Sequence, residues 1–237
     1  MSTWPDSRII DLLGIQLPII QAPMAGATTT AMVIAANQAG ALGSMPAAAL
    51  TIEQLREALS TIRQASTRPI NVNFFCHQPP DADEAGDRRW KHLLQPYYHE
   101  LGADFDAPTP VSNRAPFNEA ACQVIEAFRP EVVSFHFGLP EKTLLDRVKA
   151  TGAKVLSSAT TVEEAVWLEQ HGCDAIIAMG IEAGGHRAQR TRLIGGNHHG
   201  GSRGTGHGGL DDGQLNAQQV DDSRVWPGAH GMRLQRE

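Results

Sequence analysis

The residue types best suited to chemistry gather just after an apolar run of the chain. Residues 174–179 have the pattern of a short buried strand, and Gly184, Gly185 and His186 follow it closely. Glycines in this place let the backbone approach a flat or anionic ligand, because no Cβ stands in the way. Histidine can transfer protons near neutral pH. The segment is therefore a candidate catalytic site, and the simpler alternative is a glycine-rich turn with an incidental surface histidine.

Composition limits the class of protein. The chain has 237 residues, of which 41% are hydrophobic and 5% aromatic, so aliphatic side chains must fill most of a sizeable core. A net charge of -6 and the lack of any Lys/Arg run argue against binding to nucleic acid. The start of the chain lacks the pattern of a signal peptide, and no apolar run reaches the roughly 18 residues of a membrane span. We therefore expect a cytoplasmic protein that has no membrane partner.

Cysteines and histidines give no defined metal site. Cys76, Cys122 and Cys173 are odd in number and form no C-x-x-C pair, so we expect reduced, buried thiols. A cluster at His198, His199 and His207 has no carboxylate or cysteine spaced to complete a site. We expect no metal cofactor, and weak metal binding by this cluster stays as an alternative.

Short apolar runs alternate with amphipathic stretches from residue 19 onward. The expected strands cover residues 19–24, 41–45, 70–76, 132–138, 154–158 and 174–179. The expected helices cover residues 28–39, 51–65, 83–101, 117–128, 141–150 and 161–171. Near-continuous apolar strands predict a parallel sheet in an α/β protein. A TIM-type (β/α)8 barrel with about six βα units present fits better than an open sheet, because candidate functional residues follow nearly every strand.

Two segments depart from this alternation. Residues 77–116 are longer than an ordinary connection, which is typical of a lid or a specificity element. Residues 188–237 hold 11 of the 23 glycines and no periodic apolar run. We therefore expect an incomplete barrel domain over residues 1–187, followed by an irregular, disordered Gly/His/Arg-rich tail over residues 188–237.

Five segments, in the same order, resemble those of nitronate monooxygenases, formerly called 2-nitropropane dioxygenases. They read PIIQAPMAG (18–26), VNFF (72–75), VSFHFG (133–138), SSATT (157–161) and EAGGHR (182–187). The resemblance covers about residues 8–187. It implies an FMN-dependent (β/α)8 enzyme that oxidises alkyl nitronates with dioxygen to carbonyl compounds and nitrite.

The resemblance also implies roles for single residues. His186 is the expected catalytic residue, which binds substrate and acts as the base towards neutral nitroalkanes. His136 is expected to line the substrate site, with a core histidine as the alternative. The residues expected to bind FMN are Ala22, Pro23, Met24, Asn73, Ser158, Met179, Gly184 and Gly185. Asn73 could instead cap the turn that follows its strand, and Met179 stands where relatives usually have Gln.

The tail bears on activity. Relatives bind the FMN phosphate with loops after the seventh and eighth strands, and residues 188–237 show no pattern for such strands. We therefore expect a truncated or frameshifted member that retains flavin weakly and has little activity. Alternatives are an FMN-dependent enoyl-acyl-carrier-protein reductase, which shares the barrel and the Gly-Gly-His motif, and a non-catalytic remnant. The expected partners are a small-molecule nitronate and dioxygen, and the sequence does not define an oligomeric state.

Overall fold

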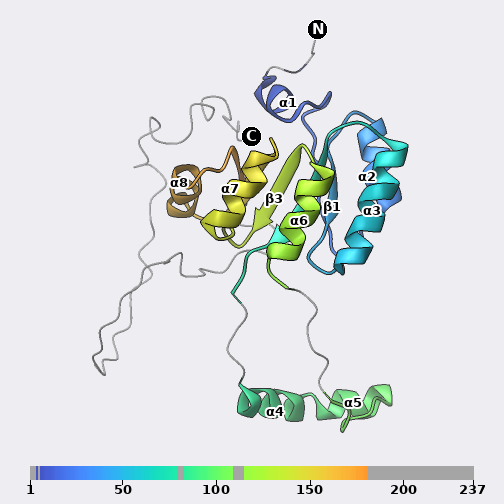
Figure 1. The fold of residues 1–237 in the computed structure, drawn as a ribbon. Helices are drawn as coiled ribbons and strands as arrows, with labels where there is room; N and C mark the ends of the chain where they lie inside the picture. The colour runs from blue at the N-terminus through green and yellow to red at the C-terminus, as the bar shows by residue number, and fades with distance from the viewer. Residues whose placement is uncertain (1–3, 5, 79–82, 109–114, 181–237) are drawn as a thin grey trace, which may run out of the picture. The chain divides into compact units, whose positions relative to one another are not determined.

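A parallel sheet organises the chain. The computed structural model describes residues 4, 6–78, 83–108 and 115–180 (Figure 1). Five strands pair in sequence order, and every pairing is parallel. They are β1 (Gly43–Pro46), β2 (Ile70–Phe75), β3 (Val132–His136), β4 (Lys154–Ala159) and β5 (Ala175–Ala178). Helices connect successive strands, which confirms the predicted α/β class and the βα order of a barrel.

Side-chain caps fix where most of these helices begin. The helices are α1 (Arg8–Leu13), α2 (Thr30–Gln38), α3 (Ile52–Ala65), α4 (Glu84–Leu93), α5 (Gln95–Leu101), α6 (Glu119–Phe128), α7 (Lys142–Ala150) and α8 (Val162–Gln170). Thr51 and Thr161 each form a capping box with the residue three positions later. Thr29 and Asn118 accept a backbone hydrogen bond at the starts of α2 and α6. The sequence predicted these starts to within two residues, but it did not predict α1.

One face of the sheet packs against helices. Val72 and Phe74 of β2 and Phe135 of β3 lie in a core cluster with Leu59 of α3 and Ile125 of α6. Figure 1 shows α6 and α7 lying along this part of the sheet. Alternation along each strand then directs the neighbouring residues to the opposite face. The apolar residues of the strands therefore divide between two faces, as in a barrel wall with helices outside.

The opposite face is apolar only at the amino ends of the strands. There Leu42, Val132 and Leu156 form a second buried cluster with Leu13 and Ile15, which belong to α1 and the residues after it. Farther along, the same face carries the buried polar residues Ser44, Asn71, Asn73, Ser134 and Ser158. Polar groups therefore replace apolar ones toward the carboxyl ends, where ligands bind in (β/α) barrels.

The expected strand over residues 19–24 is wrong for most of its length. Only Ile20 forms a bridge, parallel to Leu42 beside β1. The Gln21 side chain accepts from the Ser44 backbone N–H, and Pro23 has no N–H to continue the pairing. The apolar residues of this segment therefore form a single bridge, and a polar turn follows it.

The excursion over residues 77–116 contains α4 and α5 rather than one helix over residues 83–101. The first helix ends at Leu93, and Pro96 lies in the first turn of the second, where proline is tolerated. Trp90, Leu93 and Leu101 are exposed on this pair of helices.

Among the described residues the cysteines are free, as expected, although only Cys122 is fully buried. Burial raises the pKa of the Cys173 thiol to about 12, which keeps it protonated.

Candidate functional site

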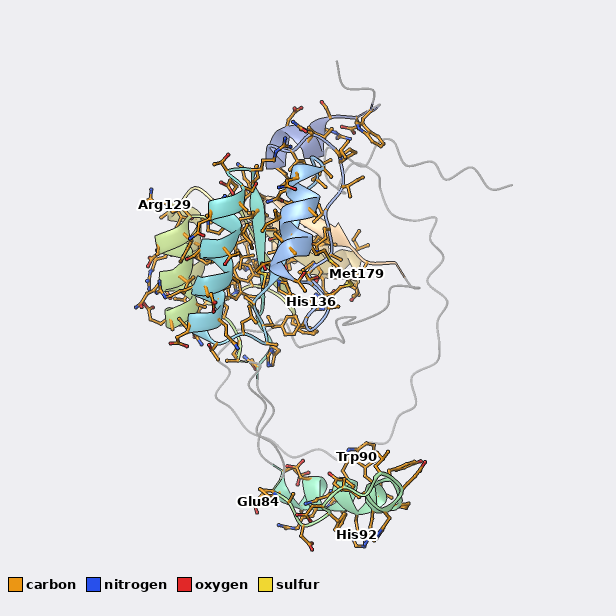
Figure 2. The ribbon with its side chains drawn as sticks, turned by 90° about the vertical axis from the view of Figure 1, so that its right-hand side faces the viewer. Glu84, Trp90, His92, Arg129, His136 and Met179 are labelled. Atoms are coloured by element: carbon orange, nitrogen blue, oxygen red, sulfur yellow. The ribbon has the colours of Figure 1, made fainter. Side chains whose placement is uncertain are left out.

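The carboxyl ends of β2, β3 and β4 bring the predicted polar residues together. The register sets Asn73 beside Ser134 and Phe75 beside His136. Figure 2 shows His136 and Met179 toward one end of the sheet, and Arg129, which precedes β3, toward the other. Asn73, His136 and Ser158 therefore lie toward the same edge of the sheet.

Asn73 is tied to the neighbouring strand. Its Nδ2 donates to Ser134 Oγ at 2.9 Å and to the Ser134 carbonyl at 3.3 Å, and the residue is only 8% exposed. It therefore does not cap the following turn, which was the alternative interpretation. Within the described part of the chain, Asn73 Oδ1 accepts no hydrogen bond, so an acceptor is left for a ligand.

His136 and Ser158 meet across β3 and β4. His136 Nδ1 lies within hydrogen-bonding distance of Ser158 Oγ. The His136 ring also contacts Phe75, with centroids 5.9 Å apart. His136 is partly exposed at the last position of β3, so it is not a histidine of the closed core. The contact orients the imidazole and leaves Nε2 as the ring nitrogen directed away from the serine.

Thr28 organises the turn that carries Ala22, Pro23 and Met24. Its hydroxyl donates to the Ala22 carbonyl at 3.2 Å and accepts from the Met24 N–H at 3.0 Å. The Met24 N–H is therefore satisfied within the turn by the buried Thr28 hydroxyl.

The remaining predicted residues divide between the described and the undescribed parts of the chain. The Met179 N–H donates to the Ala159 carbonyl at 3.0 Å, which extends the pairing of β4 and β5 toward the site. Gly184, Gly185 and His186, like the His198–His199–His207 cluster and the tail over residues 188–237, lie outside the described residues.

Sequence reasoning missed two aromatic residues at this edge. The His77 and Phe137 rings lie 6.2 Å apart, and each packs edge-on against Phe75. The sequence contains a signal for His77. Side chains alternate between the two faces of a strand, so residues 73, 75 and 77 lie on one face and His77 continues the face of Asn73 beyond the end of β2.

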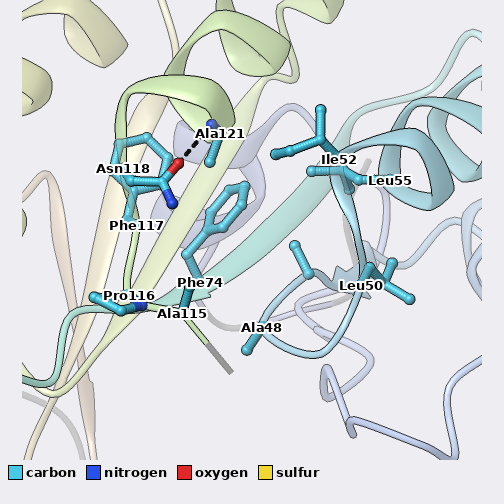
Figure 3. A pocket seen from close by; sticks show the side chains of 11 residues that line it. Ala48, Leu50, Ile52, Leu55, Phe74, Ala115, Pro116, Phe117, Asn118 and Ala121 are labelled. Atoms are coloured by element: carbon cyan, nitrogen blue, oxygen red, sulfur yellow. Dashed lines mark hydrogen bonds between the residues drawn. The ribbon is translucent and has the colours of Figure 1, made fainter. Parts of the chain in front are cut away.

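A pocket lies elsewhere, between α3 and α6 on the helix-covered face (Figure 3). Its lining is mostly apolar, with Leu50, Leu55, Phe74 and Phe117 among the side chains, and it contains no titratable group. The Asn118 side chain beside it caps α6 by accepting from the Ala121 N–H at 3.1 Å. This pocket therefore lacks the groups for acid–base chemistry.

The described residues hold neither a membrane-spanning helix nor a metal-binding cluster. No helix in them has both the length and the apolar character needed to cross a membrane. No three His, Cys, Asp or Glu side chains in the same ranges gather closely enough to hold a metal ion.

A parallel sheet with polar side chains at its carboxyl ends and helices outside is typical of proteins of the (β/α)-barrel class. Residues 6–204 match the family model for nitronate monooxygenase. The chain belongs to the nitronate monooxygenase family, whose members are generally flavin-dependent.

Individual relatives agree with this assignment. The chain is 43% identical over 183 residues to a nitronate monooxygenase from Pseudomonas aeruginosa, covering 76% of this chain and 52% of the relative. It is 41% identical to one from Paraburkholderia phytofirmans, covering 76% of this chain and 49% of the relative. The chain therefore spans about half the length of these curated relatives.

Solved structures show the same fold. A nitroalkane oxidase from Streptomyces ansochromogenes is similar with a TM-score of 0.67 and 34% identity, over 76% of this chain and 50% of that one. FabK from Thermotoga maritima is similar with a TM-score of 0.56 and 27% identity, over 77% of this chain and 46% of that one.

Proposed function

We propose that this chain carries the flavin- and substrate-facing part of an FMN-dependent enzyme that oxidises alkyl nitronates with dioxygen to carbonyl compounds and nitrite. Family membership supports the reaction class. The observation that carries the assignment to this edge of the sheet is the meeting of Asn73, His136 and Ser158 there. We further propose residues 1–187 as the barrel domain, residues 188–237 as a separate Gly/His/Arg-rich segment, and the cytoplasm as the site of action.

The described residues fit one side of a flavin ring. Asn73 Oδ1 is an acceptor of the kind a ring N–H requires, and Asn73 is held in place by Ser134. We assign flavin contact also to Ala22, Pro23, Met24, Ser158, Met179, Gly184 and Gly185. The Met24 contribution is its half-exposed side chain rather than its N–H. A flavin bound there would supply the redox chemistry of such a site.

The protein groups bind the substrate and move a proton. We assign His136, which Ser158 orients, to the lining of the substrate site beside the anionic nitronate. We assign His186 the role of base, which removes the α-proton of a neutral nitroalkane. A nitronate has already lost this proton, so only the neutral substrate requires the base.

Nitrite release tests the proposal. The chain, incubated with excess FMN, ethylnitronate and dioxygen, should release nitrite above the level given by free FMN. Weak flavin retention would make the rate rise with the FMN concentration well beyond one equivalent. Release equal to the level of free FMN at every concentration would contradict the proposed activity.

A flavin-dependent enoyl reductase is the second candidate, because the fold is also similar to FabK. The same preparation, given a reduced nicotinamide cofactor and an unsaturated acyl thioester, separates the two. Oxidation of the nicotinamide that depends on the thioester, without nitrite release from ethylnitronate, would favour this candidate. A chain inactive in both assays would fit a non-catalytic remnant.

A further inference from the structure

One side of the helices α4 and α5 is apolar and open to solvent. Four large residues on these helices, Trp90, Leu93, Tyr97 and Leu101, are 59–79% exposed. They follow one another at intervals of three or four residues, so they lie along one side of consecutive helical turns. The backbone stays nearly helical between α4 and α5, because Leu94 has φ -84° and ψ -6°. We call these four exposed residues the apolar stripe.

The other side of the two helices has its own packing partner. The Phe105 ring lies 5.5 Å from the Tyr98 ring and 6.1 Å from the His92 ring, measured between centroids. Lys91 Nζ lies 5.3 Å from the centroid of the same Phe105 ring. Figure 2 shows Trp90 and His92 on opposite sides of the helices. In the described part of the chain, the segment after α5 therefore covers one side and leaves the apolar stripe exposed.

The apolar stripe has the size of an interaction surface. α4 has 10 residues and α5 has 7, and helices shorter than about 12 residues are marginal in water unless an apolar face packs. The four side chains expose roughly 500 Å², and patches of this size on soluble proteins mark interaction sites. Two such stripes in contact would bury about 1,000 Å², which reaches the lower end of the range for specific interfaces.

Charged residues beside the apolar stripe are arranged for pairing between two copies. Arg89 and Glu100 flank the same side of it, because the 11 positions from one to the other make almost three helical turns. An antiparallel arrangement with Leu93 opposite Tyr97 of a second copy also brings Arg89 opposite Glu100, since both pairs are centred near position 95. Opposite charges at such flanking positions determine partner and orientation in packed helices. Arg89 lies 3.9 Å from Asp83 with both side chains exposed, and such a pair exchanges easily.

We propose that α4 and α5 form a self-association surface, through which two copies of this chain pair antiparallel with their apolar stripes in contact and Arg89 opposite Glu100. Residues 83–106 carry six acidic and three basic side chains, which disfavours an anionic membrane as the occupant. Two-fold symmetry lets each charged pair form twice, which favours a second copy. The surface does not depend on the proposed flavin chemistry.

Sedimentation equilibrium of the full chain tests the proposal. We expect a reversible monomer–dimer equilibrium with a Kd on the order of micromolar. Leu93→Glu should weaken dimerisation by tenfold or more, because it places a carboxylate at the centre of the apolar contact. Arg89→Glu and Glu100→Arg should each weaken it severalfold, because like charges then face each other across the interface. The double variant should restore dimerisation, because it reverses both charges.

Arg88→Glu is the matched control. Arg88 forms a similar exposed ion pair within α4, with Glu84 at 3.5 Å, but it lies two positions from Trp90 and therefore on the far side of the helix. Arg88→Glu should leave the Kd unchanged, and weakening equal to that of Arg89→Glu would overturn the pairing with Glu100. Failure of the double variant to restore dimerisation would overturn it too.

Two results would overturn the self-association surface as a whole. The first is a dimer that Leu93→Glu leaves intact, because two copies would then meet elsewhere. The second is a wild-type chain that stays monomeric at roughly 100 μM. A lower urea midpoint for Leu93→Glu in such a monomer would show that the rest of the chain covers the apolar stripe instead.

Discussion

At the scale of single residues, the proposed site consists of side chains that a neighbouring side chain holds in place. Asn73 shows this most clearly, since its Nδ2 bonds to Ser134 and its Oδ1 is left for a ligand. His136 is held in a similar way, by Ser158. Sequence reasoning found these residues from the resemblance, but it could not find their partners. Neither Ser134 nor the His136–Ser158 contact follows from spacing along one strand, because both depend on the register between strands.

Asn73 and Ser134 form a matched pair for mutation. Asn73→Ala and Ser134→Ala each remove the 2.9 Å bond, and each should lower the free energy of unfolding by about 1–2 kcal/mol. Only Asn73→Ala removes the acceptor, so it should weaken FMN binding by about tenfold more than Ser134→Ala. Urea unfolding and fluorescence titration with FMN measure the two effects. Equal FMN affinities in the two variants would show that Asn73 has a structural role only.

His186 is outside the described residues, so its role stays a prediction. On the FMN-loaded chain, His186→Ala should slow the turnover of neutral nitroethane on the order of 10²-fold more than the turnover of ethylnitronate, because only nitroethane needs a base. Steady-state nitrite release with each substrate measures the difference. Equal losses on both substrates would make His186 an anion-binding group, and no loss on either would make it an ordinary turn residue.

At the scale of elements, periodicity predicted most strands and helices because both patterns are local. The strands β1 to β5 lie within a few residues of the expected ranges. The exceptions have tertiary causes. The first expected strand shortens to the Ile20 bridge because the Gln21 side chain takes the Ser44 N–H. The helix α1 was missed because its stability comes from burying Leu13 against the sheet rather than from a clear local pattern.

Gly43 tests how closely α2 packs on β1. A Cβ at this position would lie 2.4 Å from the Val33 carbonyl oxygen and 2.6 Å from Asn37 Oδ1. Because the nearest atom belongs to the backbone, Gly43→Ala should lower the free energy of unfolding by about 1–3 kcal/mol or more. Thr51→Ala is the comparison, since it removes a capping box without a clash. It should lower the free energy of unfolding by about 1 kcal/mol. A Gly43→Ala chain as stable as wild type in urea would contradict this packing.

At the scale of the whole molecule, the order of the elements predicted the fold class, but it did not predict how the site is closed. The described sheet supplies Asn73, His136 and Ser158, and Gly184, Gly185 and His186 lie beyond its last described residue.

Ion pairs on the surface link the helices that cover the sheet. Arg147 of α7 bonds to Glu119 and Glu126 of α6, and these bonds lower the pKa of both carboxyls.

These lowered pKa values predict the sign of a pH effect. A carboxyl whose pKa is lower in the folded state stabilises the fold above its unfolded pKa, and this contribution is lost as the pH falls through the folded pKa. Unfolding midpoints of the wild type should therefore decline below about pH 4.5, the range in which free glutamate becomes protonated. Arg147→Met keeps the aliphatic stem and should show a smaller decline. Parallel profiles for the two proteins would show that the Arg147 pairs contribute no measurable stability.

Flavin is proposed to bind at the carboxyl ends of β2, β3 and β4. The most direct measurement is an FMN titration of the chain followed by backbone amide NMR shifts, which report even weak binding. We expect the largest shifts at Ala22, Met24, Asn73, Ser158 and Met179. Shifts confined instead to the amino ends of the strands, around Leu13, Ile15 and Lys154, would contradict it.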